Sequence, residues 1–305
     1  MSDLASEMLA YVRASHPRSR RGLEEARAVD PAAFDGYANL FLGWARGALG
    51  ERAVARTIDA FVQFTMDVNM AQGRYEATGH YEHSSYQACY DAVYNARETM
   101  DDYLWGVYLT NFAWAHHLEL SGFFETRFVA RLPEHASLVE IAPGHGGWGL
   151  LALHRRPTAR LLAFDISPSS IAIASSLAHA AGLSDRARYE LRDALELHVQ
   201  AAGSAAACIC NFLVEHLEEP ERLFAVIHHL LAPGGKAFIS GALTAAQVDH
   251  IYELRHESEL VLLAERHGLR VLETLSVNPA RTLPEARFLP RSMSLIVQKR
   301  VGELW

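Results

Sequence analysis

The 305-residue chain has few cysteines, no long hydrophobic run and no basic leader, and each absence excludes a class of protein. Three cysteines cannot all pair, and the spacing of Cys208 and Cys210 on an expected buried strand does not suit a normal disulfide. No apolar run reaches the roughly 18 residues that a membrane helix needs, and residues 1–8 carry acids where an export signal is basic. We therefore expect a cytoplasmic protein with reduced cysteines that neither spans nor contacts a membrane.

Concentrated positive charge is also lacking. The formal net charge is −8 and the isoelectric point about 6.0, and the tightest basic cluster is Arg18, Arg20 and Arg21. A surface that follows a phosphate backbone needs a stripe of Lys and Arg, so nucleic acid is not an expected partner. Half of the residues are hydrophobic, which is enough for a substantial core in one or two domains.

A glycine-rich turn is the most informative feature that is present. Residues 138–142 read as a buried strand, and the turn Pro-Gly-His-Gly-Gly follows at 143–147. Glycines in such a turn let the backbone approach a ligand and leave amide N–H groups free at the start of the next helix. The pattern predicts a site for an adenosine-type cofactor, with His145 capping the helix rather than taking part in chemistry.

A second apolar strand, residues 161–165, ends in an acid nineteen residues after Gly146. A carboxylate at this place can accept hydrogen bonds from both ribose hydroxyls, so Asp165 is the candidate ribose ligand. Ser167 and Pro168 then supply an N-cap and a first-turn proline for a helix over 171–181. Together these segments predict a βαβ unit.

The rest of the chain continues the alternation. A short strand ends at Asp193, and a Pro-Gly-Gly turn at 233–235 precedes another strand. The further predicted elements are a buried strand at 205–213, a helix at 221–231, a strand at 237–240 and two strand-like runs at 269–277 and 292–298.

This order of motifs over residues 133–305 resembles the class I S-adenosylmethionine-dependent methyltransferases. The resemblance implies an α/β fold with a seven-stranded Rossmann-like methyltransferase sheet and S-adenosyl-L-methionine as the cofactor. A nicotinamide dehydrogenase would share the first βαβ unit, but the Pro-Gly-Gly turn and the closing strand pair favour the methyltransferase. One departure is Ala142, where the family usually has glycine, and it should narrow the loop slightly without abolishing it.

The resemblance also implies a role for each of ten cofactor-binding residues. They are Glu140 (the loop and the methionine amine), Ala142, Gly144 and Gly146 (the methionine part), Asp165 (the ribose), Ile166 (flanking the adenine), Asp193 with Ala194 (the adenine amino group), and Asn211 and Phe212 (under the sulfonium). For Asp193 a helix N-cap is the alternative interpretation.

Residues 1–132 lack alternating strands and are predicted to be helical. Asp30 and Pro31 are an N-cap and a first-turn residue, and apolar residues at helical spacing run through 51–70. Leu132-Pro133-Glu134 is the expected boundary. We therefore expect a helical cap domain (1–132) that covers the carboxyl edge of the sheet and binds the substrate, followed by the cofactor domain (133–305).

Seven of the eleven tyrosines fall within residues 75–108, and three of these, within 86–94, repeat every four residues. A core stripe is one interpretation. The other is a pocket lining, because a buried phenol needs a hydrogen-bond partner. Tyr103 and Tyr108 lie nearest to the expected domain boundary and are the candidates for it, Tyr103 as a catalytic residue and Tyr108 as a substrate ligand.

A sulfonium methyl group is already activated, so the protein mainly aligns the reactants, and a base is needed only where the acceptor carries a proton. His216, which follows the fourth strand, and His250 are the other catalytic candidates, although a histidine at 216 also has a structural interpretation. His250 is expected on a helix that starts with a capping box at 244–247, together with the substrate candidates Tyr252 and Glu253.

No metal is expected from the sequence. The histidine pairs at 80 and 83 and at 116 and 117 could suggest a metal site, but neither pair has an obvious carboxylate at ligand spacing. Adjacent histidines on a helix also point about 100° apart.

The resulting hypothesis is a methyltransferase of a small molecule, with a role in natural-product biosynthesis favoured by the large aromatic cap. The alternatives are a methyltransferase of peptide or protein side chains and a non-catalytic scaffold that keeps the fold. A homodimer is compatible with the composition, and the sequence leaves open whether oxygen, nitrogen or carbon is methylated.

Overall fold

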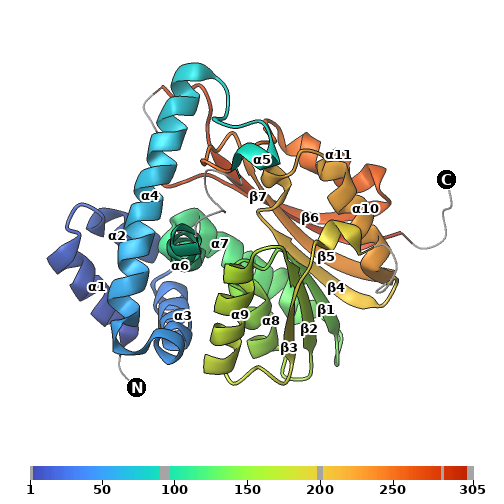
Figure 1. Ribbon diagram of the computed structural model, residues 1–305, viewed down its shortest axis with the longest axis horizontal. Helices are drawn as coiled ribbons and strands as arrows, with labels where there is room; N and C mark the ends of the chain where they lie inside the picture. Colours follow the sequence, from blue (N-terminus) through green and yellow to red (C-terminus); the bar gives the residue numbers. More distant parts are fainter. Residues whose placement is uncertain (1–2, 90–96, 198–201, 283–284, 301–305) are drawn as a thin grey trace.

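The computed structural model describes residues 3–89, 97–197, 202–282 and 285–300 and shows a group of N-terminal helices packed against a seven-stranded sheet (Figure 1). The N-terminal helices are α1 (Leu4–Ser15), α2 (Arg20–Val29), α3 (Pro31–Leu49), α4 (Ala53–Thr78), α5 (Tyr86–Cys89), α6 (Arg97–Ala113) and α7 (Ala115–Phe123). In Figure 1 the long helix α4 runs along one side of the molecule, on the opposite side from α10 (Pro220–Leu230) and α11 (Glu257–Arg266).

The sheet has the strand order β3-β2-β1-β4-β5-β7-β6, in which β7 is antiparallel to both of its neighbours and the remaining pairs are parallel. Its strands are β1 (Ser137–Ile141), β2 (Arg160–Asp165), β3 (Ala187–Leu191), β4 (Ala205–Asn211), β5 (Leu231–Leu243), β6 (Leu269–Val277) and β7 (Arg291–Lys299). The predicted fold class, a seven-stranded Rossmann-like sheet with N-terminal helices, is confirmed.

Both faces of the sheet are covered, as the continuous apolar runs of its parallel strands require. Leu138 of β1 faces a hydrophobic cluster shared with the N-terminal helices, α8 (Gly147–Arg155) and α9 (Pro168–Ala180). Its neighbour Val139 faces a second cluster with α10 and α11. The N-terminal helices thus share one core with the sheet.

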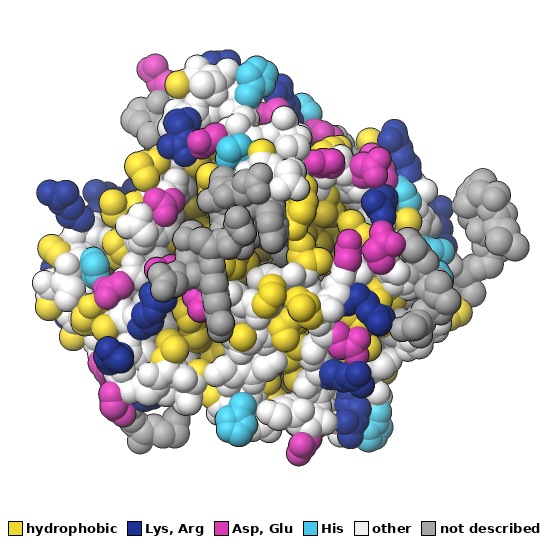
Figure 2. Space-filling model, viewed as in Figure 1, with side chains coloured by type: hydrophobic (Ala, Val, Ile, Leu, Met, Phe, Trp, Pro, Cys, Tyr) yellow, Lys and Arg dark blue, Asp and Glu magenta, His cyan; other side chains and the backbone are white. Residues whose placement is uncertain are grey.

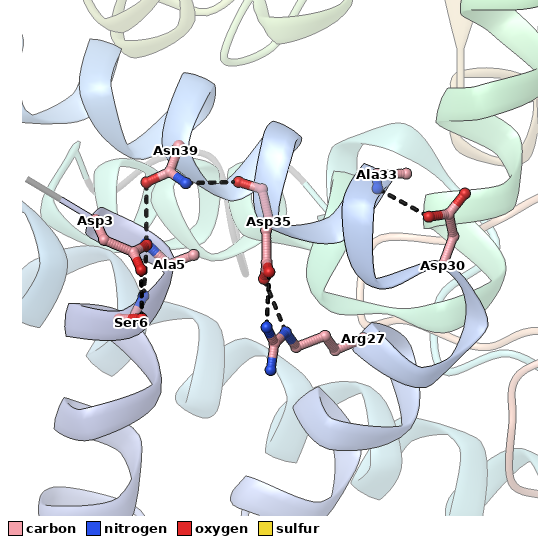
Figure 3. Close-up of polar contacts among 8 residues, drawn as sticks. All are labelled: Asp3, Ala5, Ser6, Arg27, Asp30, Ala33, Asp35 and Asn39. Atoms are coloured by element: carbon pink, nitrogen blue, oxygen red, sulfur yellow. Dashed lines mark hydrogen bonds and ion pairs between the residues drawn. The ribbon is translucent and has the colours of Figure 1, made fainter. Parts of the chain in front are cut away.

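Two predicted helix starts are confirmed, those at Asp30 and Ser167, where the N-cap side chain bonds a backbone N–H three residues further on. Asp30 accepts a hydrogen bond from the N–H of Ala33 at 2.9 Å, and Ser167 caps α9 in the same way through Ser170. Figure 3 shows how α1, α2 and α3 are held together: Asn39 accepts hydrogen bonds from the first N–H groups of α1, and Arg27 contacts Asp35 with two guanidinium nitrogens.

The prediction of a helix that starts with a capping box at 244–247 is wrong. Residues 244–256 form a loop that returns to the sheet. Thr244 has a left-handed φ of 47°, which does not suit an N-cap, and its hydroxyl donates to the carbonyl oxygen of Leu289. Its N–H donates to Leu254, which forms a parallel bridge with Leu243. His250, Tyr252 and Glu253 therefore lie on a loop.

The three cysteines are free and buried, as predicted. Among the described residues, no helix is long and apolar enough to cross a membrane. Tyr90 and Tyr94 of the predicted tyrosine repeat lie outside the described residues.

Candidate active site

A cavity of about 1260 Å³ lies where the carboxyl ends of β1, β2, β4 and β5 meet the N-terminal helices. Residues of α4 and α6, such as Phe64 and Tyr103, line one side, and residues that follow the strands line the other. Figure 2 shows hydrophobic side chains gathered in a hollow on the face drawn there. Ligands of open α/β sheets bind at this edge of the sheet, and the volume exceeds the usual range for one small ligand, about 300 to 1000 Å³.

The glycine loop after β1 forms part of the cavity wall. Gly144 and Gly146 have left-handed φ angles of 54° and 75°, and a Cβ on Gly146 would lie 2.8 Å from that of Ala174 on α9. His145, between them, accepts a hydrogen bond from the N–H of Gly147 at 2.9 Å through Nδ1. The prediction that His145 caps α8 is confirmed, and its buried ring has a pKa lowered to about 3 by desolvation.

Three residues other than glycine adopt left-handed φ angles where strands end at the cavity. They are Ala142 (50°) after β1, Phe212 (52°) after β4 and Thr244 (47°) after β5. Such conformations persist only where surrounding contacts hold them, and they concentrate at functional sites. Here the N–H of Ala142 is held by the carbonyl oxygen of Phe164 and that of Phe212 by the carbonyl oxygen of Ser240.

Glu140 lies under the glycine loop and reaches the cavity. Its Oε1 accepts a hydrogen bond from the N–H of Gly149 at 3.3 Å, while Oε2 is buried without a hydrogen-bond partner in the described part of the chain. Gly149 is needed here, because a Cβ at that position would lie 2.3 Å from Oε2. Burial raises the pKa of Glu140 to about 8, so the site favours a positively charged ligand group beside it.

Asp165 ends β2 beside the loop, where it is 8% exposed and lines the cavity. Its Oδ2 accepts from the N–H of Gly144 at 3.1 Å and its Oδ1 from that of Ser167 at 2.8 Å. Burial raises its pKa to about 6, although the backbone hydrogen bonds oppose that shift. Donors from Gly144, Ser167, Ile166 and Ser170 therefore surround the carboxylate at the end of β2.

The other predicted cofactor residues follow neighbouring strands. Ile166 is half exposed and lines the cavity, as do Asn211 and Phe212. Asn211 accepts a hydrogen bond from the hydroxyl of Ser240 at 2.5 Å, and its buried amide nitrogen has no hydrogen-bond partner among the described residues. Asp193 is exposed, and its carboxylate accepts a hydrogen bond from the N–H of Leu195. In this structure it is therefore the N-cap of a short helical turn, as the alternative interpretation predicted. Ala194 beside it is buried.

A polar cluster lines the cavity beside the segments that follow β4 and β5. The rings of His216 and His250 lie edge to face with centroids 4.8 Å apart, and both line the cavity. Tyr103 is hydrogen-bonded to Asp249, and burial together with that carboxylate raises the pKa of the phenol well above its ordinary value. The structure therefore brings together all three predicted catalytic residues.

Glu215 completes this cluster and was not predicted from the sequence. It is fully buried, and one of its carboxylate oxygens accepts from the N–H of Ala242 at 3.2 Å. Ligand atoms of Glu215, His216 and His250 all lie within 4.8 Å of one another, which makes them a candidate cation-binding group.

A set of stacked aromatic rings also lines the cavity. Trp114 stacks on Phe64 with centroids 5.6 Å apart and on His116 at 5.4 Å, and His117 stacks on Phe212 at 5.0 Å. Desolvation lowers the pKa of His116 to about 4 and that of His117 well below its ordinary value. Both histidines are therefore neutral parts of an aromatic wall.

The predicted substrate ligands Tyr108, Tyr252 and Glu253 are not brought to the cavity. Tyr108 is fully buried and donates its hydroxyl hydrogen bond to the carbonyl oxygen of Phe41 at 2.8 Å, so it is a satisfied core tyrosine. Glu253 forms an ion pair with Arg255. Tyr252 lies on the same loop as Glu253, and its N–H donates to the backbone oxygen of Glu215.

Residues 138–235 match a family described as a methyltransferase domain. The ubiquinone biosynthesis O-methyltransferase of Xanthomonas axonopodis pv. citri is 30% identical over 112 residues, which cover 36% of this chain and 45% of that protein. The chain thus spans less than half the length of the curated relatives that it matches.

Two solved structures share the fold. An O-methyltransferase family protein from Burkholderia thailandensis superposes with a TM-score of 0.52 and 18% identity, over 72% of this chain and 64% of that one. A geranyl diphosphate methyltransferase in complex with S-adenosylmethionine gives 0.51 and 14%, over 65% and 90%.

Proposed function

We propose, from the premise that residues 138–235 are a class I S-adenosylmethionine-dependent methyltransferase domain, that the chain transfers a methyl group from that cofactor to a small-molecule acceptor. One observation carries the proposal: the glycine loop, Asp165 and the polar cluster of Tyr103, His216 and His250 line the same cavity.

The cavity suits the cofactor electrostatically. S-adenosylmethionine carries a sulfonium and an ammonium charge, and the buried carboxyl groups of Glu140 and Asp165 lie beside the loop that would hold it. A cation beside a buried carboxyl offsets its desolvation. The proposed cofactor residues remain Glu140, Ala142, Gly144, Gly146, Asp165, Ile166, Asp193, Ala194, Asn211 and Phe212.

The bound cofactor would supply an electrophilic methyl carbon. The chain's own task is to exclude water and to align the acceptor, which in-line transfer requires. A lone pair of the acceptor would form the new bond to the methyl carbon while the carbon–sulfur bond breaks. The electrons of the broken bond would remain on sulfur. A proton on the acceptor must leave, and the cluster of Tyr103, His216 and His250 is where we propose that it is taken up.

A small acceptor is favoured because helices α4 and α6 contribute to the cavity wall, whereas a protein side chain would need an open groove. Residues 1–132 would then form the acceptor-binding part and residues 133–305 the cofactor-binding part. The names of two relatives, ubiquinone biosynthesis O-methyltransferase and geranyl diphosphate methyltransferase, also refer to small molecules, and the first of them supports a biosynthetic role.

Calorimetric titration of the full chain with S-adenosylhomocysteine tests the proposal. We expect micromolar binding by the wild type and a loss of at least tenfold in Asp165→Ala. The matched control is Asp185→Ala, which removes an exposed acid from the turn before β3 and should bind normally. No binding by the wild type would refute the cofactor assignment, and equal binding by both variants would refute the role of Asp165.

A further inference from the structure

The side chains of Glu215, His216 and His250 come from two separate segments and converge at the acceptor side of the cavity. One potential ligand atom of each lies within 4.8 Å of the others. Ligands about 2.1 Å from one ion are about 3.0 to 4.2 Å apart in tetrahedral or octahedral geometry. Binding an ion therefore requires only a small contraction.

Both imidazoles are oriented as metal ligands commonly are. Nδ1 of His250 lies 2.8 Å from the carbonyl oxygen of Ala245, and Nδ1 of His216 lies 3.0 Å from that of Asp249. A carbonyl oxygen can only accept, so each Nδ1 carries the proton and each Nε2 carries the lone pair. Backbone carbonyls that fix the tautomer in this way are the usual second shell of a histidine ligand.

Two atoms of this group are buried and have no hydrogen-bond partner in the described part of the chain. They are Oε2 of Glu215, a residue that is 0% exposed, and Nε2 of His250, which is 1% exposed. No ion pair among the described residues joins a Lys or Arg to Glu215.

We propose that Glu215, His216 and His250 bind one divalent first-row transition cation. Two imidazoles and one carboxylate with open positions suit zinc, iron or manganese better than the oxygen-preferring calcium and magnesium. The open positions point to the cavity, because His216 and His250 line it.

This site rests on the proposed function and narrows the acceptor to molecules that offer a hydroxyl or enol oxygen. The oxygen binds the cation, which lowers the pKa of its proton, and that proton leaves to bulk water. The oxyanion's lone pair then forms the carbon–oxygen bond as the carbon–sulfur bond breaks. The cation thus replaces the histidine rings as the group that makes the acceptor nucleophilic.

The test is a titration of the full chain with Co²⁺, followed by visible absorption, after treatment with a chelator and its removal. Zn²⁺ is then added in competition. The variants are Glu215→Gln, which keeps an oxygen to accept from Ala242, and His250→Asn. The control is His80→Asn, an exposed histidine outside the cavity. Each protein is also titrated with S-adenosylhomocysteine, which reports whether it is folded and tests the proposed function separately.

We expect the wild type and His80→Asn to bind one Co²⁺ per chain, and Glu215→Gln and His250→Asn to bind it at least about tenfold more weakly while S-adenosylhomocysteine binding persists. Wild-type protein that binds S-adenosylhomocysteine but no Co²⁺ or Zn²⁺ overturns the cation site and leaves the proposed function intact. Equal Co²⁺ binding by Glu215→Gln and the wild type also overturns it. If His250→Asn does not fold, Glu215→Gln decides.

Discussion

Asp165 accepts a hydrogen bond from the N–H of Gly144 across the carboxyl ends of β2 and β1, with 3.1 Å between Oδ2 and the nitrogen. The side chain proposed to hold the ribose therefore also holds the glycine turn in its left-handed conformation. The proposed cofactor contact and the loop geometry thus involve the same carboxylate, and its charge state should control both.

The affinity for S-adenosylhomocysteine should fall in acid. Burial raises the pKa of Asp165 to about 6, and only the carboxylate accepts from both ribose hydroxyls. At pH 5, one unit below that value, about nine-tenths of the unliganded protein carries the proton, so binding should be about tenfold weaker than at pH 7.5. Calorimetry at the two pH values measures the ratio.

Asp165→Asn supplies the control for this effect. The amide has nearly the same shape but does not titrate, so its binding should be weak and should change less between pH 5 and pH 7.5 than that of the wild type, the remaining change coming from Glu140. Wild-type affinity that does not change between these pH values would contradict the assignment of the titrating group.

The free energy of unfolding should fall as the pH rises from about 6.5 to 8. The pKa of Glu140 is raised from 4.5 to about 8 in the folded chain, so the folded state binds more protons than the unfolded state across that interval. Such a group stabilises the fold below its unfolded pKa and loses that effect as the pH passes through the folded value.

Buried histidines oppose this trend only at lower pH. His116, His117 and His145 have lowered folded pKa values, so their contribution is lost as the pH falls below about 6.5. Above that value they are neutral in both states. Urea titrations with a chelator present should show a decline of up to about 1.4 kcal/mol per pH unit from Glu140. Glu140→Gln should remove that part; an unchanged slope in the variant would contradict the shift.

Ala142→Gly should be neutral or stabilising by up to about 1.6 kcal/mol. The left-handed φ of 50° costs alanine about 1 to 2 kcal/mol, while glycine adds unfolded-state entropy worth about 0.4 to 1 kcal/mol. The matched substitution Ala172→Gly, at an exposed position inside α9, should destabilise by about 1 kcal/mol. Urea unfolding of the two variants measures the difference, and equal losses would show that Ala142 is not strained.

Local signals in the sequence were sufficient for the cofactor side of the cavity. The glycine turn, Asp165 and the Ser167 cap each depend on residues within a few positions, and a parallel sheet brings the ends of its strands to one edge. The order of motifs was enough to predict the sheet, including its closing antiparallel strands.

The acceptor side could not be predicted in the same way. Glu215 and His250 lie thirty-five positions apart, and they meet because the loop after β5 folds back onto β4 instead of forming a helix. The 244–247 pattern fits a capping box, but Leu254 and Leu289 take the hydrogen bonds that the cap would have used. Tyr108 shows the same limit, since its partner is a backbone oxygen on another helix.

Gln72 on α4 should be needed to keep that loop against the cap. Its side-chain nitrogen donates to the carbonyl oxygens of Thr244 and Phe288 at 3.2 and 3.3 Å, and its oxygen accepts from the N–H of Ala246 at 2.8 Å. Gln72→Ala should destabilise by about 1 to 3 kcal/mol, because three backbone groups lose their partner. Gln63→Ala is the matched control on the same helix, since Gln63 is exposed and its side chain donates a hydrogen bond to Asp67 on α4. Hydrogen exchange at Ala246 should accelerate at least tenfold in Gln72→Ala and not in Gln63→Ala, while S-adenosylhomocysteine binding stays within a factor of about three.

Unchanged exchange at Ala246 would show that the loop is held by its own contacts, and loss of S-adenosylhomocysteine binding would show that Gln72 also supports the glycine loop across the cavity.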